Sequence, residues 1–255
     1  MLALSSNPSY IGVNLNDSHE WNIAAKWWAD WISSGRDIYR AEILGPELLK
    51  ASGDFNGLQV LDVGCGEGWF SRILASNGAN VTAFDIANDL VEIAKEKESA
   101  SPQGIEYLTL DAEDIKQNWA VEEFDLVTAS MALECVPNIE LALEGVAAVL
   151  KPGGRLALTA AHPDSENIRH AADEPNSTSR EWIPSGLNQR RGDPSAPPIM
   201  VWRMAILDWK QLIIDSGMIV ESVQEPLLDE SLADGKPALE LATTNPPFMV
   251  ITARK

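Results

Sequence analysis

A glycine-rich segment flanked by carboxylates marks the place in this sequence where chemistry is most readily expected. Residues 60–68 read Val-Leu-Asp-Val-Gly-Cys-Gly-Glu-Gly, which puts three glycines within five residues. Glycine lets the backbone turn sharply and approach a ligand closely. Helix-like residues follow at once, so main-chain N–H groups and the positive end of a helix dipole would face that ligand. The segment therefore predicts a small-ligand site at a strand-to-helix turn.

Acidic residues at two later positions fit the same site. Asp85 follows Gly64 by about 20 residues, the distance at which a β-α-β unit places a carboxylate on a ribose diol. Residues 111–113, Asp-Ala-Glu, follow the third strand-like run. The glycine spacing is G-x-G-x-G rather than the G-x-G-x-x-G of dinucleotide sites, and Asp62 and Glu67 crowd the turn. Two carboxylates there disfavour a pyrophosphate and suit a cofactor that carries a cationic group.

The elements that must position these residues follow from two alternating patterns across residues 57–160. Apolar strand-like runs alternate with helix-like runs, which indicates β-α-β units and a parallel sheet with helices on both faces. The expected strands are 58–63, 80–84, 105–110, 124–130 and 155–160, and the expected helices are 69–77, 89–98 and 139–150. Ligands of such sheets bind outside the carboxyl ends of the strands, where the glycine segment and the acids would meet.

The flanking regions predict additions to this core, which we take as residues 57–160. Residues 1–56 have helical spacing and predict an N-terminal cap, with helices from Asp17 to Ile32, from 36 to 44 and, after a break at Gly45-Pro46, up to Lys50. Residues 161–206 predict an irregular insert that covers an acceptor.

Residues 207–255 predict a helix at 207–216 and strands at 218–223 and 248–253, separated by an acidic loop, the last strand being antiparallel. The expected fold is one α/β domain. It has a doubly wound, mostly parallel, seven-stranded sheet with an antiparallel last strand, an N-terminal helical cap and an insert after strand five.

Composition narrows the expected partners. The 255 residues carry a formal net charge of −19, which repels phosphate backbones and anionic lipid, so we expect neither nucleic acid nor a membrane as partner. No apolar run approaches the roughly 20 residues of a membrane span, and residues 1–10 do not resemble a signal peptide. Cys65 and Cys135 are too few for a disulfide framework or a four-thiolate zinc site, so we expect a cytoplasmic protein without a metal site. Monomer and homodimer both stay open.

The core resembles the class I methyltransferases that use S-adenosylmethionine (SAM). The resemblance covers about residues 58–160 and rests on several motifs in the right order. The glycine segment is similar to the first motif of the family, Asp85 to its ribose-binding acid, and Asp111-Ala112 to the pair that meets the adenine. Residues 150–154, Leu-Lys-Pro-Gly-Gly, look like the turn before the fifth strand. The outer segments resemble the small-molecule and natural-product branch of that superfamily.

The resemblance implies SAM as methyl donor and S-adenosylhomocysteine (SAH) as product. It implies that Asp85 binds the ribose hydroxyls and that Asp111 accepts the adenine amino group. Arg40 is a candidate for the methionine carboxylate, and Tyr10 for a lid over the cofactor. The residues expected at the cofactor are Tyr10, Arg40, Asp62, Gly64, Cys65, Gly66, Asp85, Ile86, Asp111, Ala112, Glu113, Ser130 and Met131.

Several side chains leave two interpretations open. His162 directly follows the fifth expected strand and is either a catalytic base or a loop histidine bonded to backbone. Glu134 either orients an acceptor or is solvated. The tryptophans of the first helix are either a docking stripe or, in part from Trp27, a wall of an acceptor cavity. Arg190-Arg191 either binds an acceptor anion or is solvated.

The sequence therefore predicts a SAM-dependent methyltransferase acting on a small-molecule or peptidic acceptor, on oxygen first and nitrogen next, with natural-product tailoring as one setting. Two alternatives stay open. One is an NAD(P)-dependent oxidoreductase, which shares the sheet and the ribose acid. The other is a non-catalytic SAM-binding partner protein that keeps the fold.

Overall fold

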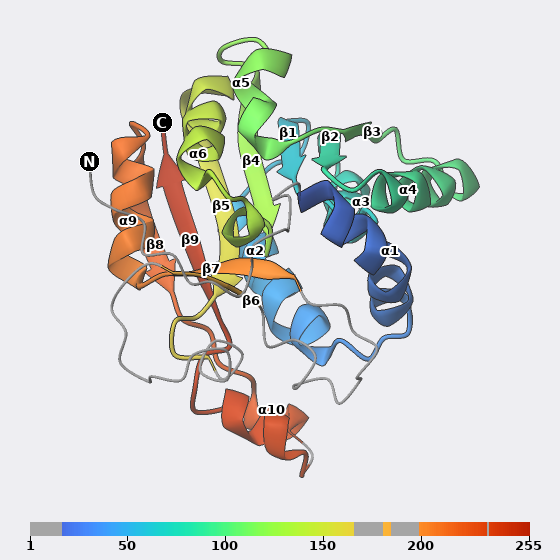
Figure 1. Cartoon of the computed structure of the whole chain (residues 1–255), viewed down its shortest axis with the longest axis vertical. Coiled ribbons are helices and arrows are strands. Elements are labelled where there is room, and N and C mark those ends of the chain that lie inside the picture. The colour runs from blue at the N-terminus through green and yellow to red at the C-terminus, as the bar shows by residue number, and fades with distance from the viewer. Residues whose placement is uncertain (1–16, 166–180, 185–198, 234) are drawn as a thin grey trace, which may run out of the picture.

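A seven-stranded sheet with the order β3-β2-β1-β4-β5-β9-β8 organises the computed structural model, which describes residues 17–165, 181–184, 199–233 and 235–255 (Figure 1). Its strands are β1 (Gln59–Val63), β2 (Asn80–Asp85), β3 (Glu106–Thr109), β4 (Phe124–Ser130), β5 (Leu150–Ala161), β8 (Ile219–Gln224) and β9 (Phe248–Arg254). The predicted doubly wound sheet is confirmed.

Strands β1 to β5 run parallel, with β1 at the centre of the set. Val63 at the end of β1 lies opposite Phe84 of β2 and Ala129 of β4. Apolar side chains of these strands are buried on both sides of the sheet, as helix-covered parallel strands require. The carboxyl ends of β1, β2 and β4 therefore meet at one edge. The glycine loop follows β1 there, and Asp85 and Ser130 are the last residues of β2 and β4.

Strand β9 runs antiparallel to both of its neighbours, β5 and β8, as the sequence predicted for the last strand. The start of β5 differs from the prediction. Residues 151–154 were expected as a turn before a strand at 155, but the strand begins at Leu150, with a register irregularity opposite Phe124 and Leu126. Because β4 pairs with β5 on both sides of this irregularity, the Pro-Gly-Gly segment becomes part of the strand.

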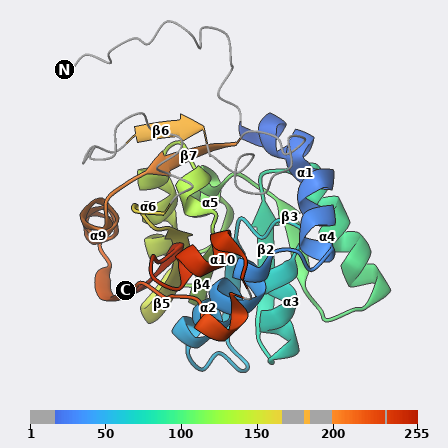
Figure 2. The same ribbon diagram turned by 90° about the horizontal axis from the view of Figure 1, so that it is seen from below.

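Two sets of helices bury the two faces of the sheet (Figure 2). On one side lie α5 (Ile115–Asn118), α6 (Ile139–Val149) and α9 (Ile206–Asp215), and on the other α2 (Gly45–Ser52), α3 (Trp69–Ser76) and α4 (Asn88–Ala100). Each set contributes to its own apolar cluster with the strand residues that face it. Burial of these two clusters is the main favourable contribution to folding.

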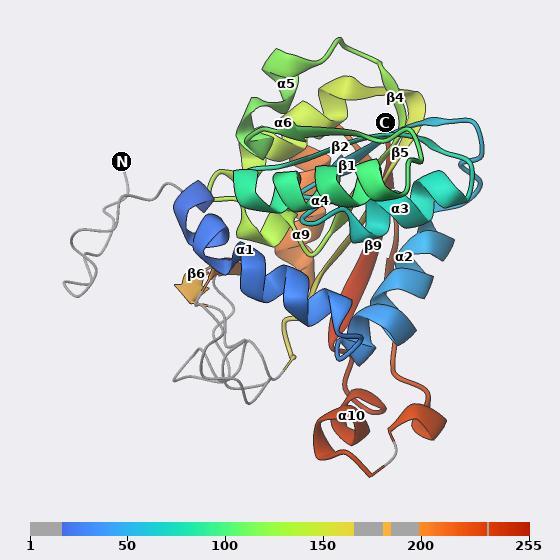
Figure 3. The ribbon, with the colours of Figure 1, turned by 90° about the vertical axis from the view of Figure 1, so that its right-hand side faces the viewer.

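The N-terminal helix α1 (Asp17–Ser33) lies alongside α4 (Figure 3). The chain then forms a π-helical segment, η2 (Arg40–Leu44), that continues directly into α2. The predicted break at Gly45-Pro46 is therefore wrong. Gly45 keeps right-handed helical angles, so the chain passes through Gly45-Pro46 without leaving the helix.

The segment between β8 and β9 was predicted as a loop, but it contains η5 (Glu230–Leu232) and α10 (Pro237–Ala242). Leu228, Leu239 and Ala242 form an apolar cluster there with Ile43 of the π-helical segment. The insert contains a short antiparallel pair, β6 (Glu181–Pro184) and β7 (Met200–Arg203). Within the described ranges, no helix combines the length and the apolar character that crossing a bilayer requires.

Candidate active site

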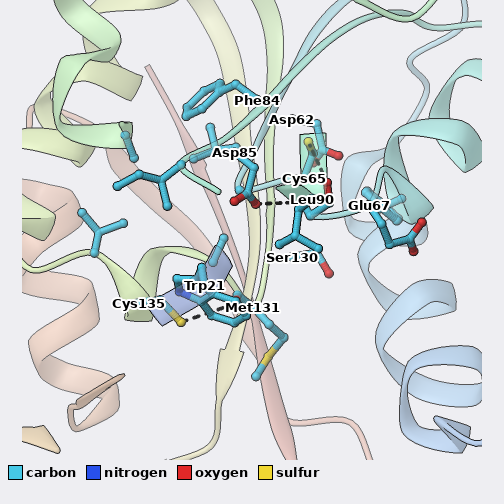
Figure 4. A pocket seen from close by; sticks show the side chains of 18 of the residues that line it. Trp21, Asp62, Cys65, Glu67, Phe84, Asp85, Leu90, Ser130, Met131 and Cys135 are labelled. Carbon is cyan, nitrogen blue, oxygen red and sulfur yellow. Dashed lines mark hydrogen bonds between the residues drawn. The ribbon is translucent and has the colours of Figure 1, made fainter. Parts of the chain in front are cut away.

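One pocket lies at the carboxyl ends of β1, β2 and β4 and is covered by α1 (Figure 4). Its walls come from four places: the glycine loop, the β2 and β3 ends, the segment after β4, and the helices α1 and η2. Eleven of the thirteen expected cofactor residues line it: Arg40, Asp62, Gly64, Cys65, Gly66, Asp85, Ile86, Asp111, Ala112, Ser130 and Met131. The structure thus brings together residues that are far apart in the sequence.

The glycine loop adopts main-chain angles that residues with a side chain rarely take. Gly64 has φ +64°, and a Cβ atom there would lie 2.4 Å from Cβ of Ala132. Gly66 has φ +56° and open space where a Cβ would stand. The N–H of Cys65 donates to the carbonyl of Phe84 at 2.9 Å, which ties the loop to β2. The loop therefore lies close to the segment after β4 on one side and leaves free space at Gly66.

Asp85 ends β2 and holds the loop through its side chain. Its Oδ2 accepts the N–H of Gly66 at 2.8 Å, and its Oδ1 accepts the N–H of Ala87 at 2.9 Å. Burial raises the pKa of Asp85, and the main-chain donors partly offset that effect. The result is a carboxyl group fixed in the pocket wall with further lone pairs available to a ligand.

Asp62 lies deeper and is fully engaged. Its Oδ2 accepts the hydroxyl of Ser71 at 2.6 Å, and its Oδ1 accepts the hydroxyl of Thr128 at 2.7 Å. Burial raises the pKa of Asp62 to about 6, while the two hydroxyl donors lower it. Because Ser71 is on α3 and Thr128 on β4, Asp62 fixes the strand relative to both neighbours.

Glu67 is the second acid of the glycine loop, and its side chain is fully buried. Its Oε2 accepts from Arg72 at 3.0 Å and forms a short contact with Nζ of Lys97 on α4. A buried carboxylate needs such partners, because its hydration is lost. The loop is therefore tied by charge to both α3 and α4.

The ends of β3 and β4 form the next part of the wall. Asp111 caps the 3-10 helix η3 (Ala112–Asp114), since its Oδ1 accepts the N–H of Glu113 at 2.9 Å. The carboxylate of Glu113 itself accepts the N–H of Asn138 at 2.9 Å, and Glu113 does not line the pocket. Glu113, which was expected at the cofactor, is therefore not part of this pocket wall.

Ser130 is the last residue of β4, and Met131 follows it. The Oγ atom of Ser130 is buried, and it has no hydrogen-bond partner within the described residues. Met131 has φ +55°, a sparsely populated angle for a side chain of this size. Its N–H donates to the carbonyl and to the Oγ1 of Thr159, each at 3.1 Å. These bonds hold the strained residue in the pocket wall.

Arg40 is the only basic residue among the described residues that line the pocket. Its side chain is 11% exposed, and its Nε lies 3.4 Å from Oδ2 of Asp37. The guanidinium carbon lies 5.2 Å from the ring centre of Trp69 and 5.6 Å from that of Trp28. Two aromatic faces thus hold one cation at the edge of an otherwise acidic pocket.

The tryptophan stripe of α1 docks the helix and also contributes to the pocket wall. Trp21 and Trp28 pack with Ala25 of α1 and with Ala87 and Leu90 near the start of α4, which docks the helix. They also line the pocket. Trp27, the expected cavity residue, is not among the lining residues and instead stacks on Trp31 with ring centres 5.6 Å apart. The contribution of α1 to the pocket wall therefore includes Trp21 and Trp28 rather than Trp27.

Comparison with known proteins identifies the core. Residues 61–158 match the methyltransferase domain family. This stretch of the chain is therefore a methyltransferase domain. A curated relative, the ubiquinone biosynthesis O-methyltransferase of Xanthomonas axonopodis pv. citri (strain 306), is 35% identical over 137 residues, which are 54% of this chain and 56% of the relative. The chain thus spans little more than half the length of the curated relatives that it matches.

Solved methyltransferases share the fold of this chain. A SAM-dependent methyltransferase from Mesorhizobium loti has a TM-score of 0.64 at 23% identity, over 82% of this chain and 96% of that one. The 1,6-didemethyltoxoflavin-N1-methyltransferase of Burkholderia thailandensis, solved with its substrate and SAH, has a TM-score of 0.60 at 14% identity, over 100% of this chain and 92% of that one. At these identities the likeness shows the fold alone.

The pocket of this methyltransferase domain fits SAM, the cofactor that the sequence predicted. Open space at Gly66 leaves room for a ligand against the main chain. The buried, unpartnered hydroxyl of Ser130 offers a hydrogen bond within the described wall. Asp85 supplies a carboxylate and Arg40 a cation. This donor set matches a ligand that carries hydroxyls and a charged amino-acid end.

His162, the expected catalytic base, is not part of the pocket wall. Its side chain is buried. Its Nδ1 accepts the N–H of Asp164 at 3.1 Å, and its Nε2 lies 2.9 Å from Oε2 of Glu225. Both ring nitrogens are engaged, so the structure supports a histidine that joins the β5 and β8 ends. Tyr10 lies outside the described residues, as does Arg190-Arg191.

Glu134 is not solvated, which corrects one of the two interpretations. It lies in the 3-10 turn η4 (Leu133–Cys135) and is 3% exposed. Burial raises the pKa of Glu134 to about 8, against the effect of main-chain donors at Glu134 and Ala161. Its Oε2 has no partner within the described residues. The carboxyl group is therefore largely protonated at neutral pH.

Several residues of the pocket wall were not predicted from the sequence. Trp69 follows the last loop glycine, and Leu90 lies in the first turn of α4. Both have apolar side chains at the start of a helix next to the ligand edge, a position that could have signalled them. Val136 and Pro137 also line the pocket, but their place depends on the path of the loop after β4, which no local pattern reveals.

Proposed function

We propose that this chain binds SAM and transfers its methyl group to a small-molecule acceptor, with oxygen favoured over nitrogen as the atom methylated. The observation that carries the proposal is the contact between Asp85 and the main chain of Gly66 beneath α1. It joins a ribose-type acid to a glycine loop with open space at one wall. The match to an O-methyltransferase of ubiquinone biosynthesis supports oxygen, and natural-product tailoring is one biological setting for the same chemistry.

Roles follow from position in the pocket. Asp85 accepts from the ribose hydroxyls, and the main chain at Gly64 and Gly66 contacts the methionine end. Ile86 and Ala112 pack on the adenine, with Asp111 accepting its amino group. These residues stand at the ends of consecutive strands, where ligands of doubly wound sheets bind.

Further roles belong to the opposite wall. Arg40 binds the carboxylate of the methionine end, since it is the pocket's basic residue among those described. The Ser130 hydroxyl hydrogen-bonds the middle of the ligand, while Met131 shapes the wall beside it. Asp62 and Cys65 act on the loop rather than on the ligand, because Asp62 is 1% exposed and bonded to Ser71 and Thr128, and the N–H of Cys65 ties the loop to β2.

SAM, when bound, supplies an electrophilic methyl group on a cationic sulfur. The chain then has to orient an acceptor in line with that methyl group and to exclude water. Trp21 and Trp28 exclude water by covering the pocket from α1. A hydroxyl acceptor must lose a proton, and His162 does not stand in the described pocket to take it. We therefore propose that acidic hydroxyls, such as phenols, are the acceptors that need least help.

The test is calorimetric titration of purified protein with SAH, with NADH as the control ligand. Micromolar binding of SAH alone would support the cofactor assignment and disfavour the oxidoreductase alternative. Release of SAH from SAM in the presence of phenolic acceptors would then separate an enzyme from a non-catalytic SAM-binding protein. Tight NADH binding without SAH binding would refute the proposal.

A further inference from the structure

Arg40 stands out because it is a single cation in an acidic pocket. The lining residues Asp62, Glu67, Asp85 and Asp111 are all acidic. The ion pair of Arg40 with Asp37 is long, at 3.4 Å, and involves Nε only. Within the described residues the two Nη atoms make no hydrogen bond. They remain available to an anionic group of a ligand.

The direction in which Arg40 points depends on the helix type at its own position. Arg40 begins the π-helical segment Arg40–Leu44, which runs on into α2. A π-turn holds one residue more than an α-turn, and each residue of an α-helix turns the chain by about 100°. If this segment were α-helical, Arg40 would be rotated by about that angle relative to α2 and would leave the face of Trp69.

Gly45 supports this π-turn in two ways, through its main-chain N–H and through the absence of a side chain. Its N–H donates to the carbonyl of Arg40, which closes the π-turn. A Cβ atom on Gly45 would lie 2.6 Å from Cη2 of Trp69 and 3.0 Å from the carbonyl oxygen of Arg40. Any larger residue at position 45 must therefore push Trp69 or the Arg40 main chain aside.

We infer that Gly45 is a positioning residue, which through the π-turn holds Arg40 against Trp69 and so makes the pocket selective for a ligand with a carboxylate. This inference rests on the proposed function, because it concerns the amino-acid end of the same cofactor. The absence of a side chain at position 45 thus contributes, together with Arg40, to the preference for a ligand with a carboxylate.

The experiment compares two ligands by calorimetry. SAH carries the amino-acid carboxylate, and 5′-methylthioadenosine has the same nucleoside without it. In wild type SAH should bind more tightly. Arg40→Gln should lower SAH affinity about 10- to 100-fold, the scale of a charged hydrogen bond, and leave 5′-methylthioadenosine within about twofold. Gly45→Ala should show the same pattern with at least a several-fold loss for SAH.

Gly145→Ala is the matched control. Gly145 lies in α6, and a Cβ there would lie 2.8 Å from Cβ of Ile115, a comparable clash away from the pocket. This variant should lower the melting temperature and leave the ratio of the two affinities unchanged. If Gly45→Ala does not fold, Trp69→Leu tests the same contact from the other side and should also reduce SAH binding selectively.

The outcomes separate the two proposals. Failure of wild type to bind either ligand would refute the proposed function itself. Wild-type binding of both, with Gly45→Ala weakening them equally or neither, would overturn the positioning role and leave the cofactor assignment standing. A selective loss of SAH in Gly45→Ala and Arg40→Gln together would establish it.

Discussion

The N–H of Gly66 donates to Oδ2 of Asp85 at 2.8 Å, so one hydrogen bond joins the loop after β1 to the end of β2. Asp85 therefore shapes the loop, and in the proposed function it also binds the ribose hydroxyls. Asp85→Ala should weaken SAH binding by roughly 1.5–3 kcal/mol, the cost of losing hydrogen bonds to a charged group. Titration calorimetry measures this directly. Asp89→Ala removes an exposed carboxylate four positions later and should leave the affinity unchanged; equal affinities in all three proteins would exclude Asp85 from the ribose.

Glu134 should make stability depend on pH. The raised pKa, about 8 in the folded protein against an ordinary value of 4.5, means that the unfolded chain loses this proton first as pH rises. Wild type should therefore lose stability relative to Glu134→Gln between pH 4.5 and pH 8, by on the order of 1 kcal/mol per pH unit. Below that window the difference should be constant. Urea unfolding at several pH values checks it, with the exposed Glu144→Gln as a flat control; a pH-independent difference for Glu134→Gln would contradict the assignment.

Glu67 should be needed for stability because its buried charge is neutralised by Arg72 and Lys97. Glu67→Gln leaves two cations beside a neutral amide, and we expect a loss of about 3 kcal/mol in unfolding free energy. The exposed pair of Glu92 with Lys95 provides the comparison: Glu92→Gln should cost less than about 0.5 kcal/mol. Similar losses in both variants would show that the Glu67 cluster contributes no more than a surface pair.

Trp202 of β7 should couple the insert to the pocket wall. Its Nε1 donates to the carbonyls of Val136 and Pro137, at 2.9 and 3.1 Å, and both of these residues line the pocket. Trp202→Phe keeps an aromatic ring and loses these bonds, so SAH affinity should fall by about 1 kcal/mol. Trp209→Phe, made in the buried α9 helix of the same core cluster, should lower stability and spare the affinity. Unchanged SAH binding in Trp202→Phe would argue against this coupling.

The cofactor wall could be predicted because its signals are local. The turn at Gly64 and Gly66 needs positive φ, and the interval to Asp85 is set by the length of one β-α-β unit. Each strand that follows ends at the same edge, so Asp111 and Ser130 could be placed by counting strands. Even the position of Arg40 in the wall was foreseen, although the π-turn that directs it was not.

Other features depend on packing between distant segments. His162 was left open between a catalytic base and a loop histidine, because its partner Glu225 directly follows β8, which no local pattern places beside it. The burial of Glu134 likewise depends on how η4 meets the end of β5. Helix α10 has only six residues, too few to form alone, and its apolar side chains pack with Ile43 near the other end of the chain.

The position of β9 sets the order in which this sheet can be completed. β9 lies between β5 and β8, although both of them precede it in the chain. While the ribosome has delivered the chain only as far as β8, neither β5 nor β8 can pair with β9, and β5 presents an open edge with Leu156 and Leu158 on it. Open edges of this kind pair with other chains. Residues 248–254 cover the edges of β5 and β8 and are the last strand of this sheet to be synthesised. We therefore expect nascent chains that are stalled before these residues to depend on chaperones.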